Sequence, residues 1–395
     1  MGKIMAVNAG SSSLKFQLLE MPQEVVLASG IVERIGEDIP CYTFKYDGKK
    51  LVGDLTNGND HTAAVKAVLE LLIQNNIVKS FDEIEGVGHR VVQGGAYFSD
   101  SAVITNEVKA KIEELSPLAP LHNPAHIKGI NAIENVLPNV PSVAVFDTAF
   151  HQTMDEVSYM YPVPYEWYSE NKVRKYGAHG TSHKYVAYEC AKAMNKPIEE
   201  LNIITCHIGN GASITAVKGG KCVDTSMGLT PLDGIPMGTR SGTLDPTVLQ
   251  YMQKQKGYDM DKLINILNKE SGYKGVSGVS NDSRDLEDRY TTDSRCKLAL
   301  DLQYKRIADY IGSYYVLMGG VDAIVFTAGI GENNGHMREE VLNRVSVLGV
   351  SVDKEANSKR GELIEISTKD SKVKAFVIPT AEELVIARDV VRLTK

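Results

Sequence analysis

Three turns rich in small residues each follow a run of apolar, strand-forming residues. They are NAGSSSLK (8–15), HIGNG (207–211) and GIGEN (329–333). Small residues let backbone N–H groups approach an anion closely, and serine hydroxyls and asparagine amides add further donors. Three such turns favour a nucleotide phosphate site, although an ordinary hairpin explains any single one equally well. None matches the Walker A motif or a GxGxxG fingerprint that opens a helix, so the P-loop and dinucleotide-binding motifs are excluded.

Two arginines stand among glycines with few other charges nearby. Arg90 lies in GHRVVQGG and Arg240 in PMGTRSG. The planar fork of guanidinium donors suits carboxylate and phosphate oxygens, and these surroundings are unusual for a solvated surface arginine. Asp147 in VFDTAFH follows an apolar run, where α/β proteins place groups that face a ligand. An aspartate that caps the next turn fits the same local sequence.

Two pairs of histidines are spaced by four residues, His122 with His126 and His179 with His183. Zinc suits neither pair, because the glutamate of HExxH is absent and Pro124 interrupts the first pair.

A helix is predicted after the second pair, with Thr181 and Ser182 as its N-cap. His179 then lies in the loop just before this helix, as a donor to an anion. The five cysteines are scattered without a CxxC pair, which fits reduced thiols in a cytosol, and Cys206 is expected to pack in a core.

Apolar periodicity predicts the elements that position these residues. Strands are expected at 3–7, 14–18, 24–34, 87–92, 142–146, 201–207, 213–217, 322–327 and 373–378, and helices at 61–75, 106–115, 338–347 and 382–392. A strand, a small-residue turn and a returning strand open the chain and recur after residue 150. This repetition predicts an internal duplication with a cleft between the two halves.

Length and charge narrow the class of protein. At about 150 residues per domain, 395 residues indicate two or three domains. Fifty acidic against 43 basic residues give a net charge of −7, which disfavours a nucleic-acid binder. The apolar region 314–330 is interrupted by Asp322 and by two glycines, and no apolar signal peptide opens the chain. We therefore expect a soluble, cytoplasmic protein without a membrane partner.

Taken together, these motifs resemble the acetokinase family along essentially the whole chain. The matching stretches, in order, are VNAGSSSLKF, GHRVVQGG, PLHNP, VFDTAFH, YGAHGTSH, HIGNGASITAVKGGK, MGLTPLDGIPMGTRSG, GVSGVSNDSRD, FTAGIGENN and IPTAEELVIARD. The resemblance implies the α/β fold of the acetate and sugar kinase, Hsp70 and actin superfamily, with two duplicated βββαβαβα domains and an interdomain nucleotide cleft. It assigns residues 1–150 and 385–395 to the first domain. Residues 151–384 form the second, which would bind the nucleotide and contact a second copy in a homodimer.

The resemblance also implies an activity and its residues. The activity is reversible, direct in-line transfer of the γ-phosphoryl group of ATP to acetate, giving acetyl phosphate and ADP, with Mg²⁺, for which Mn²⁺ can substitute. Carried over position by position, the implied residues are Asp147, Arg90, Arg240 and His179 for catalysis; Arg90, Val92, Leu121 and Pro231 for acetate; Lys15, His207, Ile208, Gly209, Asn210, Gly211, Asp282, Ser283, Arg284, Gly329, Ile330, Gly331, Glu332 and Asn333 for the nucleotide; and Asn8 and Glu383 for the metal.

Two departures from the family pattern leave alternatives open. Ala178 stands where the family usually has Phe, and a larger acyl pocket would favour a propionate or butyrate kinase. One methylene is worth only about 1–3 kcal/mol in such a pocket. Ala381 replaces the usual Asn before Glu382 and Glu383, so either glutamate could face the metal. An ATPase switch of the actin or Hsp70 kind leaves the paired arginines without a purpose, and a sugar kinase would need a base for its hydroxyl acceptor.

Overall fold

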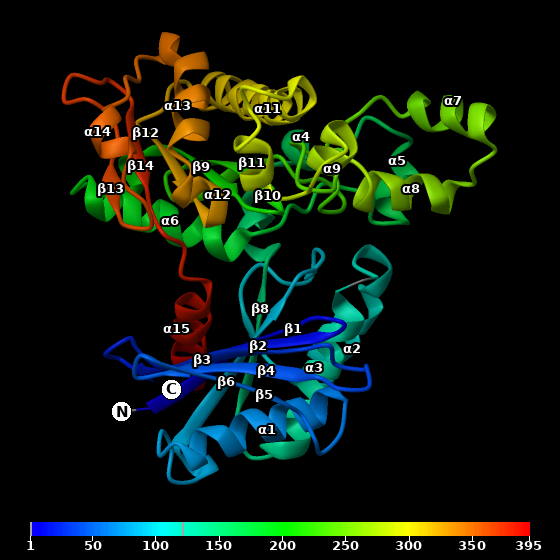
Figure 1. The fold of residues 1–395 in the computed structure, drawn as a ribbon, viewed down its shortest axis with the longest axis vertical. Helices are drawn as coiled ribbons and strands as arrows, with labels where there is room; N and C mark the ends of the chain where they lie inside the picture. The colour runs from blue at the N-terminus through cyan, green and yellow to red at the C-terminus, as the bar shows by residue number, and fades with distance from the viewer. Residues whose placement is uncertain (1, 121) are drawn as a thin grey trace. The chain divides into compact units, whose positions relative to one another are not determined.

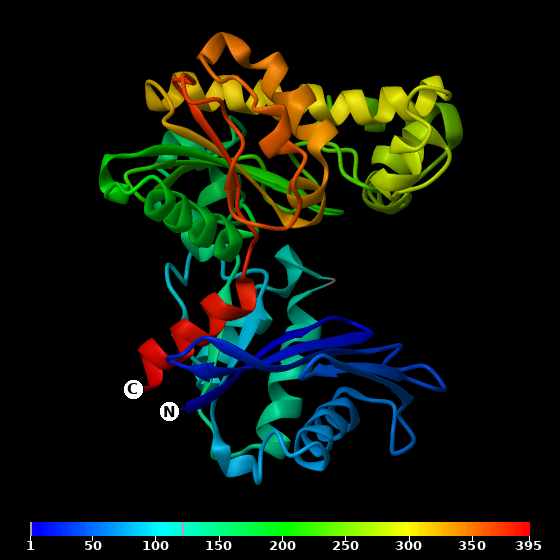
Figure 2. The ribbon, with the colours of Figure 1, turned by 60° about the vertical axis from the view of Figure 1, so that its left-hand side comes forward.

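The chain forms two compact units in a computed structural model that describes residues 2–120 and 122–395. Unit 1 consists of the described residues up to 149 together with Ala381–Lys395, and unit 2 is Phe150–Thr380. In each unit, helices cover a mixed sheet, as the ribbons of Figures 1 and 2 show.

Unit 1 contains an eight-stranded sheet of order β5-β4-β3-β2-β1-β6-β8-β7. The strands are β1 (Gly2–Ala9), β2 (Ser13–Met21), β3 (Val25–Glu33), β4 (Cys41–Tyr46), β5 (Lys49–Asp54), β6 (Ile84–Val91), β7 (Ala102–Val103) and β8 (Ser142–Phe146). The first three form an antiparallel meander, and β6 and β8 continue the sheet parallel to β1. The predicted opening meander is confirmed, whereas β4 and β5 were not predicted.

Helices cover both faces of this sheet because successive residues of a strand point to opposite sides. The helical segments of unit 1 are α1 (His61–Gln74), η1 (Phe81–Glu83), α2 (Asn106–Glu114), η2 (Ser116–Leu118), α3 (Asn123–Val136) and α15 (Glu382–Thr394). In β1, Ile4 and Ala6 share a buried cluster with residues of α15. Met5 and Val7 share another cluster with residues of α1 and α3.

Two glycines of β6 let α15 lie close to the sheet. A Cβ atom at Gly86 would come within 2.5 Å of Val390, and one at Gly88 within 2.2 Å of Ile386. Any larger residue at either position would push away the helix whose first turn carries Glu382 and Glu383.

Unit 2 repeats this strand order. Its sheet has the order β11-β10-β9-β12-β14-β13. The strands are β9 (Asn202–Ile208), β10 (Ala212–Lys218), β11 (Lys221–Thr225), β12 (Ala323–Thr327), β13 (Ile364–Glu365) and β14 (Lys374–Val377). Again three antiparallel strands are followed by two that run parallel to the first. The order β11-β10-β9-β12-β14 therefore matches β3-β2-β1-β6-β8, and the predicted duplication is confirmed.

The two faces of the second sheet are covered by different helices. The helical segments of unit 2 are η3 (Ala149–Thr153), which begins at the last residue of unit 1, α4 (Glu156–Tyr159), α5 (Tyr165–Ser169), α6 (Gly180–Ala193), η4 (Ile198–Glu200), α7 (Thr247–Lys256), α8 (Met260–Lys269), α9 (Gly272–Ser277), α10 (Ser283–Glu287), α11 (Ser294–Met318), α12 (Ala328–Asn333), α13 (Gly335–Arg344), η5 (Ser346–Leu348) and α14 (Lys354–Asn357). Ile204 and Cys206 of β9 pack in one cluster with residues of α11, and Ile203 packs in another with residues of α6. Cys206 is fully buried, as predicted.

Two helix starts differ from the prediction. The helix after the second histidine pair begins at Gly180 with His179 as its N-cap, so Thr181 and Ser182 lie inside its first turn and the predicted cap is wrong. The helix predicted from 338 begins at Gly335, because the side chain of Asn334 accepts a hydrogen bond from the backbone N–H of Met337.

Across the described residues, we find no helix with the length and apolar character needed to cross a bilayer.

Candidate active site

The sheet of unit 1 gathers the predicted chemical groups at one edge. The strands β1, β6 and β8 run parallel, so their carboxyl ends meet there. Asn8 and Arg90 lie near the ends of β1 and β6, and Asp147 directly follows β8. Glu382 and Glu383 open α15, which packs against the same strands.

Arg90 and Asp147 form a two-pronged ion pair. Nε of Arg90 donates to Oδ1 of Asp147 at 3.1 Å, and Nη2 donates to Oδ2 at 2.7 Å. Asp147 is 1% exposed, whereas the side chain of Arg90 keeps 22% of its surface accessible. The carboxylate of Asp147 therefore holds the Nε–Nη2 edge of the guanidinium, and the other edge, at Nη1, makes no hydrogen bond with the described residues.

Carboxylates outnumber the cations around Arg90. Burial opposes the charge of Arg90, but Asp147, Glu382 and Glu383 outweigh it and raise the pKa of the guanidinium. Burial also raises the pKa of Glu382, helped by Asp147 and Glu383 and opposed by Arg90 and Lys15. Lys15 is the cross-strand partner of Asn8 in the β1–β2 hairpin. The edge thus carries an excess of negative charge.

This donor set fits a magnesium ion. Magnesium takes hard oxygen ligands and usually keeps several waters, with one or two carboxylates and the substrate's phosphates completing its shell. The side chains of Asn8, Asp147, Glu382 and Glu383 offer such oxygens. In the part of the chain that is described, no three His, Cys, Asp or Glu side chains form a ready metal cage. An open site that depends on substrate oxygens agrees with both observations.

Two buried histidines near Arg90, its chain neighbour His89 and His126, are uncharged at pH 7. Burial, with a smaller effect of His126, lowers the pKa of His89 to about 3. Burial and the charge of Arg90 lower the pKa of His126 to about 4. Arg90 is therefore not joined by a second positive charge from these rings, and sequence reasoning gave neither a role.

The predicted acetate pocket is only partly described. Val92 is 7% exposed directly after β6 in unit 1. Leu121 lies outside the described residues. Pro231 belongs to unit 2, where its carbonyl accepts a hydrogen bond from Nη1 of Arg240 at 3.3 Å.

Arg240 differs from Arg90 because it has no carboxylate partner among the residues that the structure describes. Its other contact from Nη1 is with the sulfur of Met237 at 3.6 Å, and burial lowers its pKa. A partly buried cation without a counter-ion is well suited to receive an anionic ligand, since the ligand would supply the missing charge.

Arg240 and His179 meet at Gly211. A Cβ atom at Gly211 would lie 3.5 Å from Nη1 of Arg240 and 3.6 Å from Nε2 of His179. Glycine in the turn between β9 and β10 thus leaves two donors side by side, one from the start of α6 and one from the loop after β11. This arrangement suits an anion with several oxygens, such as a phosphoryl group.

His179 is held in an unusual backbone conformation. Its φ of 58° and ψ of 22° lie in the left-handed region, which costs a non-glycine residue about 1–3 kcal/mol. Nδ1 lies 2.9 Å from the hydroxyl of Ser213 on β10, and the ring stacks on His207 with centroids 4.2 Å apart. These contacts fix the direction of Nε2.

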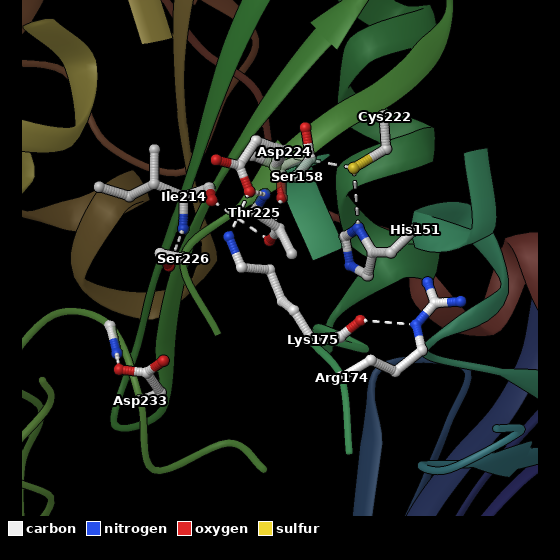
Figure 3. A network of polar contacts seen from close by, with 12 residues as sticks. His151, Ser158, Arg174, Lys175, Ile214, Cys222, Asp224, Thr225, Ser226 and Asp233 are labelled. Atoms are coloured by element: carbon white, nitrogen blue, oxygen red, sulfur yellow. Dashed lines mark hydrogen bonds and ion pairs between the residues drawn. The ribbon is translucent and has the colours of Figure 1, made fainter. Parts of the chain in front are cut away.

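The residue before His179 is also anchored. Figure 3 shows the ring of His151 facing the thiol of Cys222, with Nδ1 and Sγ 3.2 Å apart. The other ring nitrogen of His151, Nε2, donates to the carbonyl of Ala178 at 2.9 Å. Ala178 itself is 3% exposed and packs in the core of unit 2. Ala178 and His179, the two residues joined by this peptide bond, are therefore both held in place.

A cleft of about 620 Å³ in unit 2 contains many of the predicted nucleotide residues. It is lined by Gly209, Asn210, Asn281, Asp282, Ser283, Arg284, Glu287, Gly329, Ile330, Asn333, Asn334 and Arg360. Asn281, Glu287, Asn334 and Arg360 were not predicted. Glu287 pairs with the amide of Asn334, which also caps α13, so their side-chain contact joins two separate walls of the cleft.

Glu332 does not line the cleft and instead binds the backbone of two segments of unit 2. Its carboxylate accepts hydrogen bonds from the backbone N–H groups of Ala328 at 2.8 Å and Thr380 at 3.1 Å. The first of these bonds satisfies the backbone N–H at the start of a short helix, α12, where the sequence predicted a turn. Gly331 is buried in the same helix.

Comparison with known proteins gives one consistent result. The chain matches the acetokinase family over residues 3–388. It is 56% identical to an acetate kinase of Geobacillus sp. (strain WCH70) over 394 residues, covering 100% of this chain and 99% of that one. It is also 56% identical to an acetate kinase of Shouchella clausii over 397 residues, covering 100% of both chains.

Solved structures agree over the full length. A crystal structure of Porphyromonas gingivalis acetate kinase has a TM-score of 0.96 at 45% identity and covers 100% of both chains. A propionate kinase from Francisella tularensis subsp. tularensis has a TM-score of 0.93 at 42% identity, again covering 100% of both chains. The two duplicated α/β units therefore have the actin-like ATPase fold, as the family resemblance implied.

Proposed function

The chain belongs to the acetokinase family, and from that premise we propose that it transfers the γ-phosphoryl group of ATP reversibly to acetate, giving acetyl phosphate and ADP. It is a phosphotransferase with a carboxyl group as acceptor, since relatives named acetate kinase share 55–56% identity with it over their full length.

One observation carries the assignment of catalytic residues. Arg240 and Nε2 of His179 converge at Gly211, in the turn whose Gly209 and Asn210 line the cleft. Arg240 lacks a carboxylate partner among the described side chains. An arginine that stabilises a phosphoryl transition state can contribute about 10³–10⁵ in rate. We propose that this pair binds the transferring phosphoryl group.

The acceptor needs orientation and no general base. A carboxylic acid is already ionised at pH 7, so catalysis consists mainly of positioning and charge neutralisation. We propose that Arg90 binds the carboxylate of acetate through its open edge. Asp147 then orients Arg90, because both of its oxygens are engaged with the guanidinium.

We assign the metal to the acidic edge of unit 1. Asn8 and Glu383 are the proposed ligands. Asp147 and Glu382 lie nearby, since Asp147 and Glu383 both raise the pKa of Glu382. A bound Mg²⁺ or Mn²⁺ ion would supply positive charge to the phosphate oxygens as an anionic acceptor approaches. Lys15, exposed at the start of β2, would contact the phosphates.

We also propose a cytoplasmic homodimer, as the family resemblance implies. Large apolar side chains on the surface of unit 2 support this proposal, because contact with a second copy would bury them. Among them are Trp167, Tyr251 and Met260, which are 48%, 62% and 51% exposed.

The decisive experiment is a coupled assay of ATP and Mg²⁺ with short carboxylic acids, in which hydroxylamine traps the acyl phosphate. Acetate should give the highest kcat/KM, and the transferred phosphorus should invert its configuration. Hydrolysis of ATP at a rate that added carboxylate leaves unchanged would instead favour an ATPase switch, and retained configuration would indicate a phosphoenzyme.

A propionate kinase is the second candidate. Its support is the structural likeness to a propionate kinase at 42% identity over the whole chain. The same assay separates the two, since a propionate kinase should give its highest kcat/KM with propionate.

A further inference from the structure

A chain of short hydrogen bonds leads away from His179 into the core of unit 2. Nδ1 of His179 contacts the hydroxyl of Ser213 at 2.9 Å, and Nε2 of His183 contacts the same hydroxyl at 2.7 Å. Nδ1 of His183 contacts the hydroxyl of Thr205 at 2.7 Å. Ser213, His183 and Thr205 are each 0% exposed, so water does not compete for these bonds.

His183 is a neutral ring. Burial lowers the pKa of His183 well below its ordinary value, and the neighbouring rings of His151 and His207 lower it further. A neutral imidazole has one nitrogen that donates and one that accepts. If both histidines donated to Ser213, its buried hydroxyl hydrogen would be left without an acceptor among the described residues. With Ser213 donating one bond and accepting one, the hydrogen bonds from Thr205 to His179 can run in only two directions, and each direction gives His179 a different tautomer.

In the first direction every hydrogen has a short contact. The hydroxyl of Thr205 donates to Nδ1 of His183, Nε2–H of His183 donates to Ser213, and the hydroxyl of Ser213 donates to Nδ1 of His179. Neutral His179 then carries its hydrogen on Nε2.

In the reverse direction Nδ1–H of His183 donates to Thr205, so the hydroxyl hydrogen of Thr205 must go elsewhere. Among the described residues, the remaining acceptor near it is the carbonyl of Thr215 at 3.5 Å. Hydroxyl donors normally have contacts of 2.5–3.0 Å, and a buried donor left without one costs about 1–3 kcal/mol. The first direction is therefore favoured.

We propose that Thr205, His183 and Ser213 form a relay that fixes neutral His179 as the Nε2–H tautomer, so that it donates to the phosphoryl group without first being protonated. The relay rests on the proposed function only in the identity of the group that receives this hydrogen. Ser213, His183 and Thr205 are positioning residues, because they act through His179.

A second relay with the same direction supports the assignment. The hydroxyl of Thr380 donates to Ser182 at 2.8 Å, which leaves the hydrogen of Ser182 for Nδ1 of His207 at 2.8 Å. His207 then also carries its hydrogen on Nε2. The rings of His179 and His207 stack 17° from parallel, so both imidazoles are oriented by hydroxyl groups beneath them.

Long-range ¹H–¹⁵N NMR of the full-length protein labelled at histidine tests the relay directly. The signals of His179 are identified by their absence in His179→Gln, and the nitrogen that bears hydrogen is read at pH 8. The relay predicts hydrogen on Nε2 in the unaltered protein. Hydrogen on Nδ1, or a doubly protonated ring at this pH, would overturn it.

Ser213→Ala breaks the relay at its centre. We expect a mixture of His179 tautomers and a kcat lowered about 10–100-fold, the usual range for partners that orient a functional histidine. KM for ATP and for acetate should change less than about threefold, because the lost interaction acts in the transition state. An unchanged tautomer and kcat, or an effect confined to KM, would contradict the relay.

Thr205→Val serves if Ser213→Ala does not fold, because it preserves shape and does not touch His179. It should also mix the tautomers of His179, and Thr205→Ser should restore the single form. Thr215→Val is the matched control, since Thr215 is the cross-strand partner of Thr205 and equally buried, and among the described residues its hydroxyl hydrogen-bonds only with that of Thr225. It should leave tautomer and kcat unchanged.

The readouts separate this inference from the proposed function. If the unaltered protein phosphorylates no carboxylic acid, or if His179→Gln keeps full activity, the proposed function fails. The tautomer of His179 and its response to Thr205→Val would still decide the relay.

Discussion

The two candidate arginines differ in what balances their charge. Arg90 is paired through two hydrogen bonds with an aspartate that is 1% exposed. Arg240 contacts a carbonyl and a sulfur and has no acidic partner in the described part of the chain. Replacing each therefore has a different consequence for stability, although both changes should abolish most of the activity.

Arg240→Ala should lower kcat by about 10³-fold or more, because the charge that stabilises the phosphoryl group is lost. Its thermal unfolding midpoint should stay close to that of the unaltered protein, since no buried carboxylate loses a partner. Steady-state kinetics and thermal denaturation measure the two effects, with Arg240→Lys as the control for charge without the planar fork. Near-normal turnover in Arg240→Ala would refute the assigned role.

Arg90→Ala should lose activity and stability together. Removing one partner of a buried ion pair costs about 3–5 kcal/mol, because the carboxylate of Asp147 is left buried and uncompensated. The double variant Arg90→Ala/Asp147→Asn should recover much of the free energy of unfolding but none of the activity. If Arg90→Ala unfolds like the unaltered protein in urea, the ion pair is not the stabilising contact that its geometry indicates.

At the scale of elements, β6 and α3 carry buried neutral histidines into the core of unit 1. The pKa values of His89 and His126 fall from 6.5 to about 3 and about 4 in the folded chain. Below pH 6.5 the unfolded chain binds protons that the folded chain cannot. Stability contributed by the neutral rings is thus present above pH 6.5 and is lost as the pH falls towards the folded values.

We accordingly expect the free energy of unfolding to fall between pH 6.5 and pH 4, by up to about 1.4 kcal/mol per pH unit for each ring. Urea denaturation followed by circular dichroism measures this loss. The only tryptophan in the sequence, Trp167, belongs to unit 2. Its fluorescence therefore follows the unfolding of unit 2, which can be compared with the loss of circular dichroism from both units. His126→Leu should reduce the dependence on pH seen by circular dichroism. Equal slopes in the two proteins would show that His126 is not a buried neutral ring.

For the whole molecule, the cleft that we propose for the nucleotide lies within one of the duplicated units. All twelve residues that line it belong to unit 2. A ligand that binds only the folded state stabilises it by about 2.7 kcal/mol at a concentration one hundred times its Kd.

ADP should therefore raise the unfolding midpoint reported by Trp167, and acetate alone should raise it less. Thermal denaturation followed by tryptophan fluorescence checks this, with AMP at the same concentration as the control for ionic strength. An unchanged midpoint at saturating ADP would place the nucleotide elsewhere.

The duplication itself was readable from local sequence, because period-two alternation and small-residue turns depend on neighbours in the chain. The helix α11 was not predicted, because local apolar pattern alone was ambiguous at its end. The apolar run at 314–330 straddles the end of α11 and the whole of β12, so the run by itself did not separate the two elements.

The residue types could be read from the sequence, and so could their local settings: strand ends for Arg90 and Asp147, a small-residue turn for Asn8, a helix start for His179 and a glycine-flanked loop for Arg240. Only the tertiary structure decided their partners. Arg90 meets Asp147 across 57 residues, and His183 meets Thr205 across 22, because strand order, and not spacing along the chain, brings side chains together. The same non-local pairing left Glu287 and Arg360 out of the predicted cleft, since neither belongs to a glycine-rich turn.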